Sequence, residues 1–136
     1  MRGAEGLNLL ADTHACAWWI VGGGRLSEPA VRALSDADQI LISIASLWEA
    51  GIKVGKFGAE RSGPLAPWLD RITRDGPPAS VSILEVALPD CRAVSRLPSH
   101  HGDPFDRMLA AQAMARDLAI VSADPVFDDY GVKRIW

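Results

Sequence analysis

Four acidic residues stand at points of the chain where a fold can bring their side chains together. Asp12 ends one apolar run, at residues 7–11, and Asp124 follows another, at 118–122; Glu49 and Asp106 fall in helical patterns. Ionised carboxylates that share a site repel one another, and a hard cation such as Mg²⁺ or Mn²⁺ compensates their charge. Such an ion activates water and stabilises the leaving oxygen of a phosphodiester. If these acids converge, they predict metal-dependent phosphodiester hydrolysis.

The stretch 100–116 predicts a helix with an acidic start. Asp103 takes the N-cap position and Pro104 the first helical position, where a missing N–H costs nothing. Asp106 lies three residues before Leu109, on the same apolar face, so we expect its carboxylate at the edge of the core. Asp103 suits the cap and Asp106 suits the metal, but either carboxylate of this motif remains a candidate ligand.

Each of these acids also has an ordinary structural interpretation. Asp12 and Asp103 are typical helix N-caps, and Lys53 stands four residues after Glu49, the spacing of an exposed ion pair. Hydroxyl residues beside the acids either orient ligands and water or cap the backbone locally. These residues are Thr13, Ser46 and Ser122.

The elements that must position these acids alternate between strand and helix. The expected strands are 7–11, 39–43, 81–86, 118–122 and 132–136, and the expected helices are 15–21, 27–37, 43–54, 64–74, 89–97 and 103–116. This alternation predicts a single α/β domain with a mostly parallel central sheet flanked by helices on both faces, an α/β/α arrangement. Right-handed crossovers place the carboxyl ends of its strands at one edge, where Asp12 and Asp124 then lie.

Composition narrows the class of protein. The chain has 136 residues, 49% hydrophobic and 23% charged, which suits one globular domain. A net charge of −3 argues against a basic nucleic-acid coat protein, although a nuclease with a local basic rim fits. No apolar run approaches the ~20 residues that span a bilayer, and the start lacks a signal-peptide pattern. Cys16 and Cys91 have no metal-site spacing, so we expect reduced thiols in a cytoplasmic protein.

Other catalytic patterns are weaker. The sequence has no GxxxxGK[ST] phosphate loop and no GxSxG elbow. The three histidines are candidate bases or ligands, with surface or capping roles as the alternative: His14, His100 and His101. Most tryptophans fit the core by their spacing, although three of them also suit a partner-binding groove: Trp18, Trp19 and Trp68.

Four ordered motifs point to one known family. They are residues 9–14 with 18–19, residues 46–50 with 52–53 and 55–56, residues 101–107 with 109 and 111–113, and residues 122–124 with 127, 130–132 and 135–136. With these motifs the sequence resembles the PIN-domain ribonucleases, specifically the VapC toxins of bacterial toxin–antitoxin pairs. The resemblance covers almost the whole chain, from residue 7 onward, and departs mildly where Ser122 replaces a commoner Thr.

The resemblance implies a Mg²⁺-dependent endoribonuclease that cleaves tRNA or rRNA, forms a homodimer and is inhibited by a small cognate antitoxin. By motif position, Asp12, Glu49 and Asp106 carry over as the core metal-binding acids, and Asp124 as a fourth. Asp103 belongs to the same motif as Asp106. The PIN domain is expected over 7–136, with 1–6 as a flexible tail.

Two alternatives remain open at this point. The first is a PIN-like module that binds an antitoxin or RNA without useful catalysis, and the second is a phosphate-metabolising α/β enzyme, which lacks its phosphate loop here. The presence of all four acids favours the nuclease. Arg107 and Lys53 are candidate phosphate contacts, with plain surface charges as the alternative.

Overall fold

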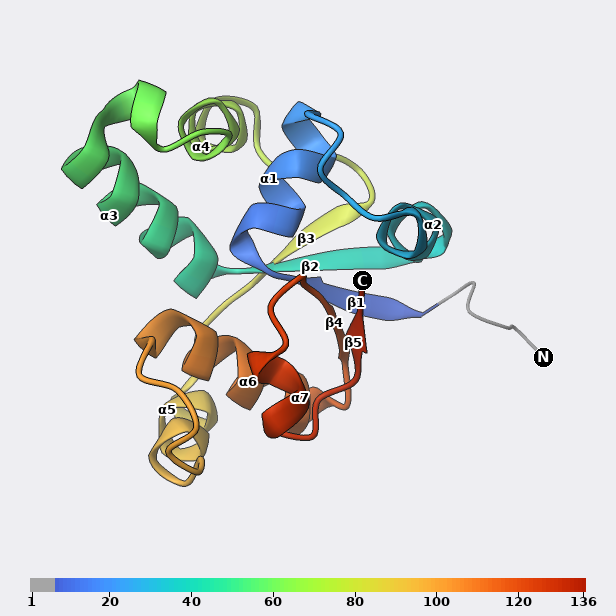
Figure 1. Ribbon diagram of the computed structural model, residues 1–136, viewed down its shortest axis with the longest axis vertical. Helices are drawn as coiled ribbons and strands as arrows, with labels where there is room; N and C mark the ends of the chain where they lie inside the picture. The colour runs from blue at the N-terminus through green and yellow to red at the C-terminus, as the bar shows by residue number, and fades with distance from the viewer. Residues whose placement is uncertain (1–6) are drawn as a thin grey trace.

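The computed structural model describes residues 7–136, and the tail expected at residues 1–6 lies outside them. Within this range the chain forms a five-stranded parallel sheet in the order β3-β2-β1-β4-β5 (Figure 1). The elements are β1 (Asn8–Ala11), α1 (Thr13–Val21), α2 (Glu28–Asp36), β2 (Gln39–Ser43), α3 (Ile44–Arg61), α4 (Leu65–Asp75), β3 (Val81–Leu84), α5 (Leu88–Ser95), α6 (Pro104–Arg116), β4 (Ala119–Val121), α7 (Val126–Asp129) and β5 (Arg134–Ile135).

The register of the sheet aligns the carboxyl ends of three strands. Ala11, the last residue of β1, pairs with Ile42 of β2 on one side and with Val121 of β4 on the other. The backbone N–H of Asp12 then donates to the carbonyl of Val121 at 3.1 Å. The residues that follow β1, β2 and β4 therefore begin next to one another, as the strand pattern predicted.

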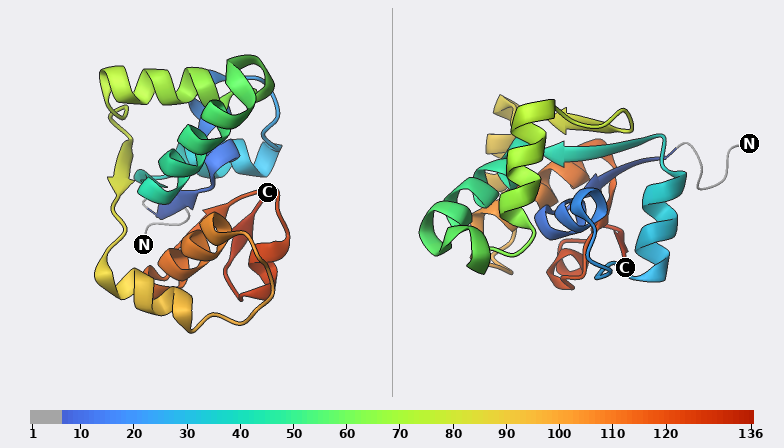
Figure 2. Two further views of the ribbon diagram at one scale, coloured as in Figure 1. Left: turned by 90° about the vertical axis from the view of Figure 1, so that its left-hand side faces the viewer. Right: turned by 90° about the horizontal axis from the view of Figure 1, so that it is seen from above.

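Helices cover both faces of the sheet, which confirms the predicted α/β/α class. Successive residues of β1 point to opposite faces of the sheet. Leu9 belongs to the hydrophobic cluster that contains Trp68 of α4, whereas Leu10 belongs to the cluster that contains Leu109 of α6 and Phe127 of α7. Figure 1 shows α1, α2, α3 and α4 above the sheet and α5, α6 and α7 below it, and Figure 2 shows the same division from two other sides.

Three elements differ from the sequence expectation. Gly55 does not end α3, which continues to Arg61 with a break at Gly58, whose φ of 84° no other residue type readily adopts. The single turn of α7 was not predicted, since four residues carry no helical period. The last strand is only Arg134–Ile135. No helix of the described residues is long and apolar enough to cross a membrane.

Candidate metal centre

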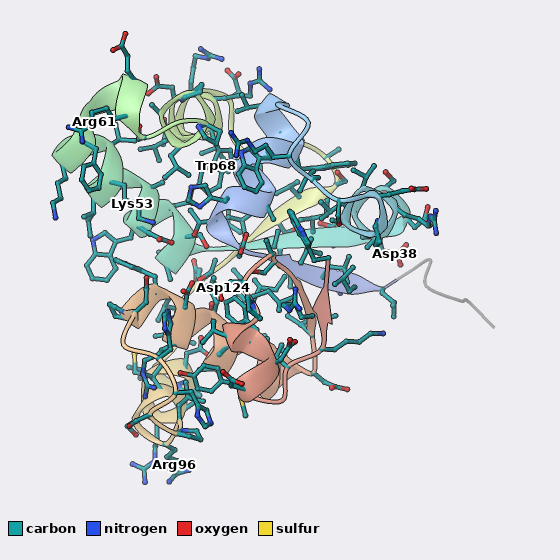
Figure 3. The ribbon with its side chains drawn as sticks, in the orientation of Figure 1. Asp38, Lys53, Arg61, Trp68, Arg96 and Asp124 are labelled. Atoms are coloured by element: carbon teal, nitrogen blue, oxygen red, sulfur yellow. The ribbon has the colours of Figure 1, made fainter. Side chains whose placement is uncertain are left out.

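A cavity of about 540 Å³ opens where the strands β1 and β4 end, between α1, α3 and α6. Five carboxylate residues line it, together with one lysine, two histidines and a tryptophan. The lining residues are Asp12, Thr13, His14, Trp18, Glu49, Lys53, His101, Asp103, Asp106, Ala123 and Asp124. In Figure 3, Asp124 lies near the middle of the molecule, where the upper and lower helical layers meet. The structure thus brings together all the acids that the sequence marked.

Asp12 is both a helix cap and a wall of this cavity. One carboxylate oxygen, Oδ1, accepts the N–H of Ala15 at 2.8 Å and so caps α1, while Oδ2 accepts the hydroxyl of Ser122. The pKa of Asp12 is raised to about 6, mainly by burial and also by the charges of Glu49 and Asp124, although the hydrogen bonds from Ser122 and Ala15 oppose the shift. The capping interpretation is therefore correct but incomplete.

Glu49 lies inside the protein, and its side chain is held at both oxygens. Only 5% of the residue is exposed; Oε1 accepts the hydroxyl of Thr13 at 2.6 Å and Oε2 accepts Lys53 Nζ at 2.6 Å. The ion pair that the i, i+4 spacing suggested exists, but it forms part of the cavity wall and not a solvated surface. Thr13 joins α1 to α3 through this contact.

Asp103 and Asp106 both reach the cavity. Asp103 Oδ1 caps α6 by accepting the N–H groups of Phe105 at 2.8 Å and Asp106 at 3.2 Å. Asp106 Oδ2 lies 3.1 Å from Nε2 of His101. The pKa of Asp106 is raised to about 6, chiefly by burial and next by the charge of the neighbouring Asp103. Because capping uses only Oδ1 of Asp103, its role as a cap does not remove it from the cavity.

Ser122 connects the last two acids. Its buried hydroxyl donates to Asp12 and accepts the N–H of Asp124 at 3.0 Å, while Oδ1 of Asp124 accepts the N–H of Val126 at 3.0 Å. Asp124 is exposed on the outer wall. The seryl hydroxyl therefore fixes the distance between the chain segments that follow β1 and β4.

Two residues expected near the site do not line the cavity. The guanidinium of Arg107 donates to the carbonyls of Val94, Leu97 and Pro98, so it ties the end of α5 to α6 and lines a separate groove. One residue along a helix turns the side chain by about 100°, which carries Arg107 away from the cavity that Asp106 faces. Ser46 is buried, and its hydroxyl has no hydrogen-bond partner among residues 7–136.

Two aromatic contributions were not predicted in full. His101, a candidate base or ligand with a surface or capping role as the alternative, lies with its ring nitrogen beside Asp106, and ligand atoms of His101, Asp103 and Asp106 lie within 4.8 Å of one another. Trp68 is buried in the core as its spacing suggested, whereas Trp18 lines the cavity. The only sequence signal for His101 was its position five residues before Asp106 within the acidic motif.

The residues present fit a divalent cation. Five carboxylates share the cavity with one lysine, and that lysine is bound to Glu49. The raised pKa values of Asp12 and Asp106 reflect buried carboxylates that lack sufficient positive charge. Hard oxygen donors of this kind suit Mg²⁺ or Mn²⁺ better than a soft metal.

The comparison with known families agrees with this geometry. The PIN domain profile matches residues 9–133, which is most of the chain. The chain belongs to the PIN domain family. The matched range begins in β1, includes all five acids of the cavity and ends before β5, so the PIN fold and the acidic cavity are one unit.

Individual relatives are PIN toxins and ribonucleases. Ribonuclease VapC22 of Mycobacterium tuberculosis is 28% identical over 120 residues, covering 85% of this chain and 86% of its own. The structure of VapBC2 from Rickettsia felis bound to a promoter DNA fragment has a TM-score of 0.65 at 14% identity, over 96% of this chain and 100% of that one. The sarcin–ricin loop cleaving toxin VapC20 of Mycobacterium tuberculosis has a TM-score of 0.60 at 17% identity, over 91% and 95%.

Proposed function

We propose that this PIN domain, over residues 7–136, is the toxin of a toxin–antitoxin pair and acts as a Mg²⁺-dependent endoribonuclease. The observation that carries the proposal is the convergence of five carboxylates on one cavity at the carboxyl edge of the sheet. The relatives support it, since VapC22 is a ribonuclease and VapC20 cleaves the sarcin–ricin loop.

Asp12, Glu49 and Asp106 would hold the metal, with Asp124 and Asp103 completing the oxygen donors. Their five side chains are the acidic lining of the cavity. When bound, Mg²⁺ (or Mn²⁺) supplies a Lewis acid that lowers the pKa of water and neutralises charge on the phosphate. Five carboxylates are more than one Mg²⁺ ion usually binds, because Mg²⁺ keeps several water ligands. Asp103 or Asp124 would then orient a water molecule.

The remaining polar groups position the acids. Ser122 fixes the Asp12 carboxylate, and Thr13 fixes that of Glu49, so neither acid rotates freely. Lys53 balances the charge of the buried Glu49 and has two further N–H groups for a phosphate oxygen. His101 holds one oxygen of Asp106. Such supporting contacts keep ligands in a productive orientation.

The exposed face of α3 carries apolar side chains that suit a contact with another protein. Ile44, Trp48 and Ile52 stand one turn apart along the helix and are 41%, 66% and 44% exposed. Apolar side chains exposed in a continuous stripe are typical of an interaction surface. We assign this face to a protein contact, with a cognate antitoxin and a second copy of the chain as the expected partners. The cytoplasm, where RNA is available, is the expected compartment.

A cleavage assay tests the proposal. Purified protein is incubated with a mixed tRNA and rRNA pool, with Mg²⁺ or with EDTA, beside Asp106→Asn. The matched control is Asp70→Asn, the same change at an exposed acid of α4. We expect discrete fragments that need metal, persist with Asp70→Asn and disappear with Asp106→Asn. Folded protein that cleaves nothing would favour the binding module, and cleavage unaffected by Asp106→Asn would move the metal site to Asp103.

A further inference from the structure

Three aromatic rings form a row that starts in the acidic cavity. The centroids of His14 and Trp18 lie 5.4 Å apart with an interplanar angle of 51°, and those of Trp18 and Trp136 lie 6.3 Å apart at 49°. All three residues are partly exposed. Such distances are those of interacting aromatic pairs, so the rings form one surface and not three separate side chains.

The row and the metal centre share a helix. His14 and Trp18 are four residues apart on α1, so they lie on one face of the helix that Asp12 caps, and both line the cavity beside the carboxylates. Trp136 packs against the core above the sheet and anchors the outer end of the row. The position of the rings relative to Asp12 is therefore fixed by one rigid element.

Charge alone gives RNA little reason to enter this cavity. Five carboxylates and a single lysine line it, and the whole chain carries a net charge of −3. Attraction that does not depend on phosphate charge is needed beside the metal. Aromatic rings supply it, because every nucleobase has a π-face that stacks on them.

We propose that His14, Trp18 and Trp136 form a nucleobase-binding subsite, on which an unpaired base next to the scissile phosphate stacks. This inference rests on the proposed ribonuclease function and adds the side chains that would hold an unpaired base beside the metal centre. A paired base has its faces covered by its neighbours and does not reach the row. The protein would then select its RNA substrates by the exposure of a base more than by contacts to phosphate groups.

Fluorescence anisotropy with two probes tests the subsite. One probe is fluorescein-labelled hexa-adenylate, and the other has the same backbone and charge with abasic sugars; Ca²⁺ replaces Mg²⁺, and a denaturing gel checks that the probe stays intact. The wild-type protein should bind hexa-adenylate about tenfold more tightly than the abasic probe. Trp18→Leu should remove that preference without changing affinity for the abasic probe, and Trp18→Phe should retain most of it.

The matched control is Phe57→Leu, which removes an exposed aromatic ring outside the cavity and should bind both probes as wild type does. Equal affinity of the wild-type protein for the two probes would overturn the subsite, and this comparison holds even if Trp18→Leu does not fold. A full base preference in folded Trp18→Leu, or an equal loss in Phe57→Leu, would overturn it as well. The cleavage assay judges the nuclease independently, because base preference is measured here without catalysis.

Discussion

Replacing Asp12 by Asn should abolish RNA cleavage and, at the same time, stabilise the metal-free protein. Asn keeps the cap, because its side-chain oxygen accepts the N–H of Ala15 as Asp12 Oδ1 does, and its amide donates to the hydroxyl of Ser122. What disappears is the charge, which the metal requires and which is costly to keep in this half-buried position.

The magnitude follows from the pKa of Asp12, which burial raises from 3.8 to about 6. One pKa unit corresponds to about 1.4 kcal/mol, so the charge costs on the order of 3 kcal/mol at pH 7.5 in EDTA. We expect Asp12→Asn to raise the free energy of unfolding by about 2–3 kcal/mol and the melting temperature by roughly 10 °C. Nearby carboxylates that become easier to ionise add to the gain.

The sign of the pH dependence is opposite to that of a salt-bridged carboxylate. Because the folded-state pKa is raised, the folded wild-type protein binds more protons than the unfolded chain between about pH 4 and pH 6. Stability from this group is therefore present below pH 4 and is lost as pH rises through 6. The advantage of Asp12→Asn should shrink towards zero at pH 4, and Mg²⁺ at pH 7.5 should stabilise the wild-type protein more than the variant.

Urea unfolding in EDTA at pH 7.5 and at pH 4, followed by circular dichroism, measures both effects. Asp70→Asn, an exposed acid of α4, controls for a change in net charge and should shift stability by less than about 0.5 kcal/mol. A variant less stable than wild type at pH 7.5 would contradict this prediction, because the Asp12 carboxylate would then stabilise the protein more as a cap than it destabilises it as a buried charge.

Three further predictions follow from single contacts. Ser122→Ala removes the hydroxyl that holds Asp12, so Mn²⁺ affinity measured by calorimetry should fall 10- to 100-fold in a protein that still folds; unchanged affinity would exclude this positioning role. Asp90→Ala removes the carboxylate that pairs with Arg116 of α6 at 2.8 and 3.1 Å and accepts the N–H of Ala87; because the remaining Arg116 side chain is 30% exposed, urea unfolding should show a loss of about 2–3 kcal/mol, and specific activity of the folded fraction should persist. Gly58→Ala forces a side chain onto a φ of 84° and should cost about 1–2 kcal/mol, whereas no loss of melting temperature would show that α3 straightens there.

The sequence predicted the acids after β1 and β4 well, because the signal there is local. Asp12 and Asp124 each follow a short apolar run, and parallel strands of an α/β sheet end at one edge whatever the details of packing. The helical start at Asp103 was equally readable, since the cap and Pro104 act within one turn.

The orientation of α3 was not readable from apolar spacing. Ile44, Trp48 and Ile52 repeat every four residues, a spacing that indicates a helix, yet all three are exposed, while Glu49 and the small Ala45 and Ala50 face inward. The carboxylate of Glu49 lines the cavity, and the small side chains of Ala45 and Ala50 allow α3 to approach the sheet closely. Periodicity identifies a face of a helix without saying whether the chain itself or a partner covers it.

Contacts between distant segments were the other gap. Thr13 meets Glu49 across 36 positions, and Arg107 is occupied by carbonyls at the end of α5. Such pairings depend on how the helices pack against one another. Residue types and their spacing in the sequence therefore do not determine which group a cationic side chain near a motif contacts. Arg107 therefore resembled a substrate contact in the sequence and serves as a tie between helices in the fold.

If the carboxylates of this cavity hold a divalent ion for RNA cleavage, a Mn²⁺ titration followed by electron paramagnetic resonance should detect that ion. The signal of free Mn²⁺ is measured with wild-type protein, with Asp106→Asn and with Asp70→Asn at pH 7.5. We expect saturable binding to the wild type and to Asp70→Asn, and at least tenfold weaker binding to Asp106→Asn. Folded wild-type protein that binds no Mn²⁺, or equal binding by all three proteins, would contradict it.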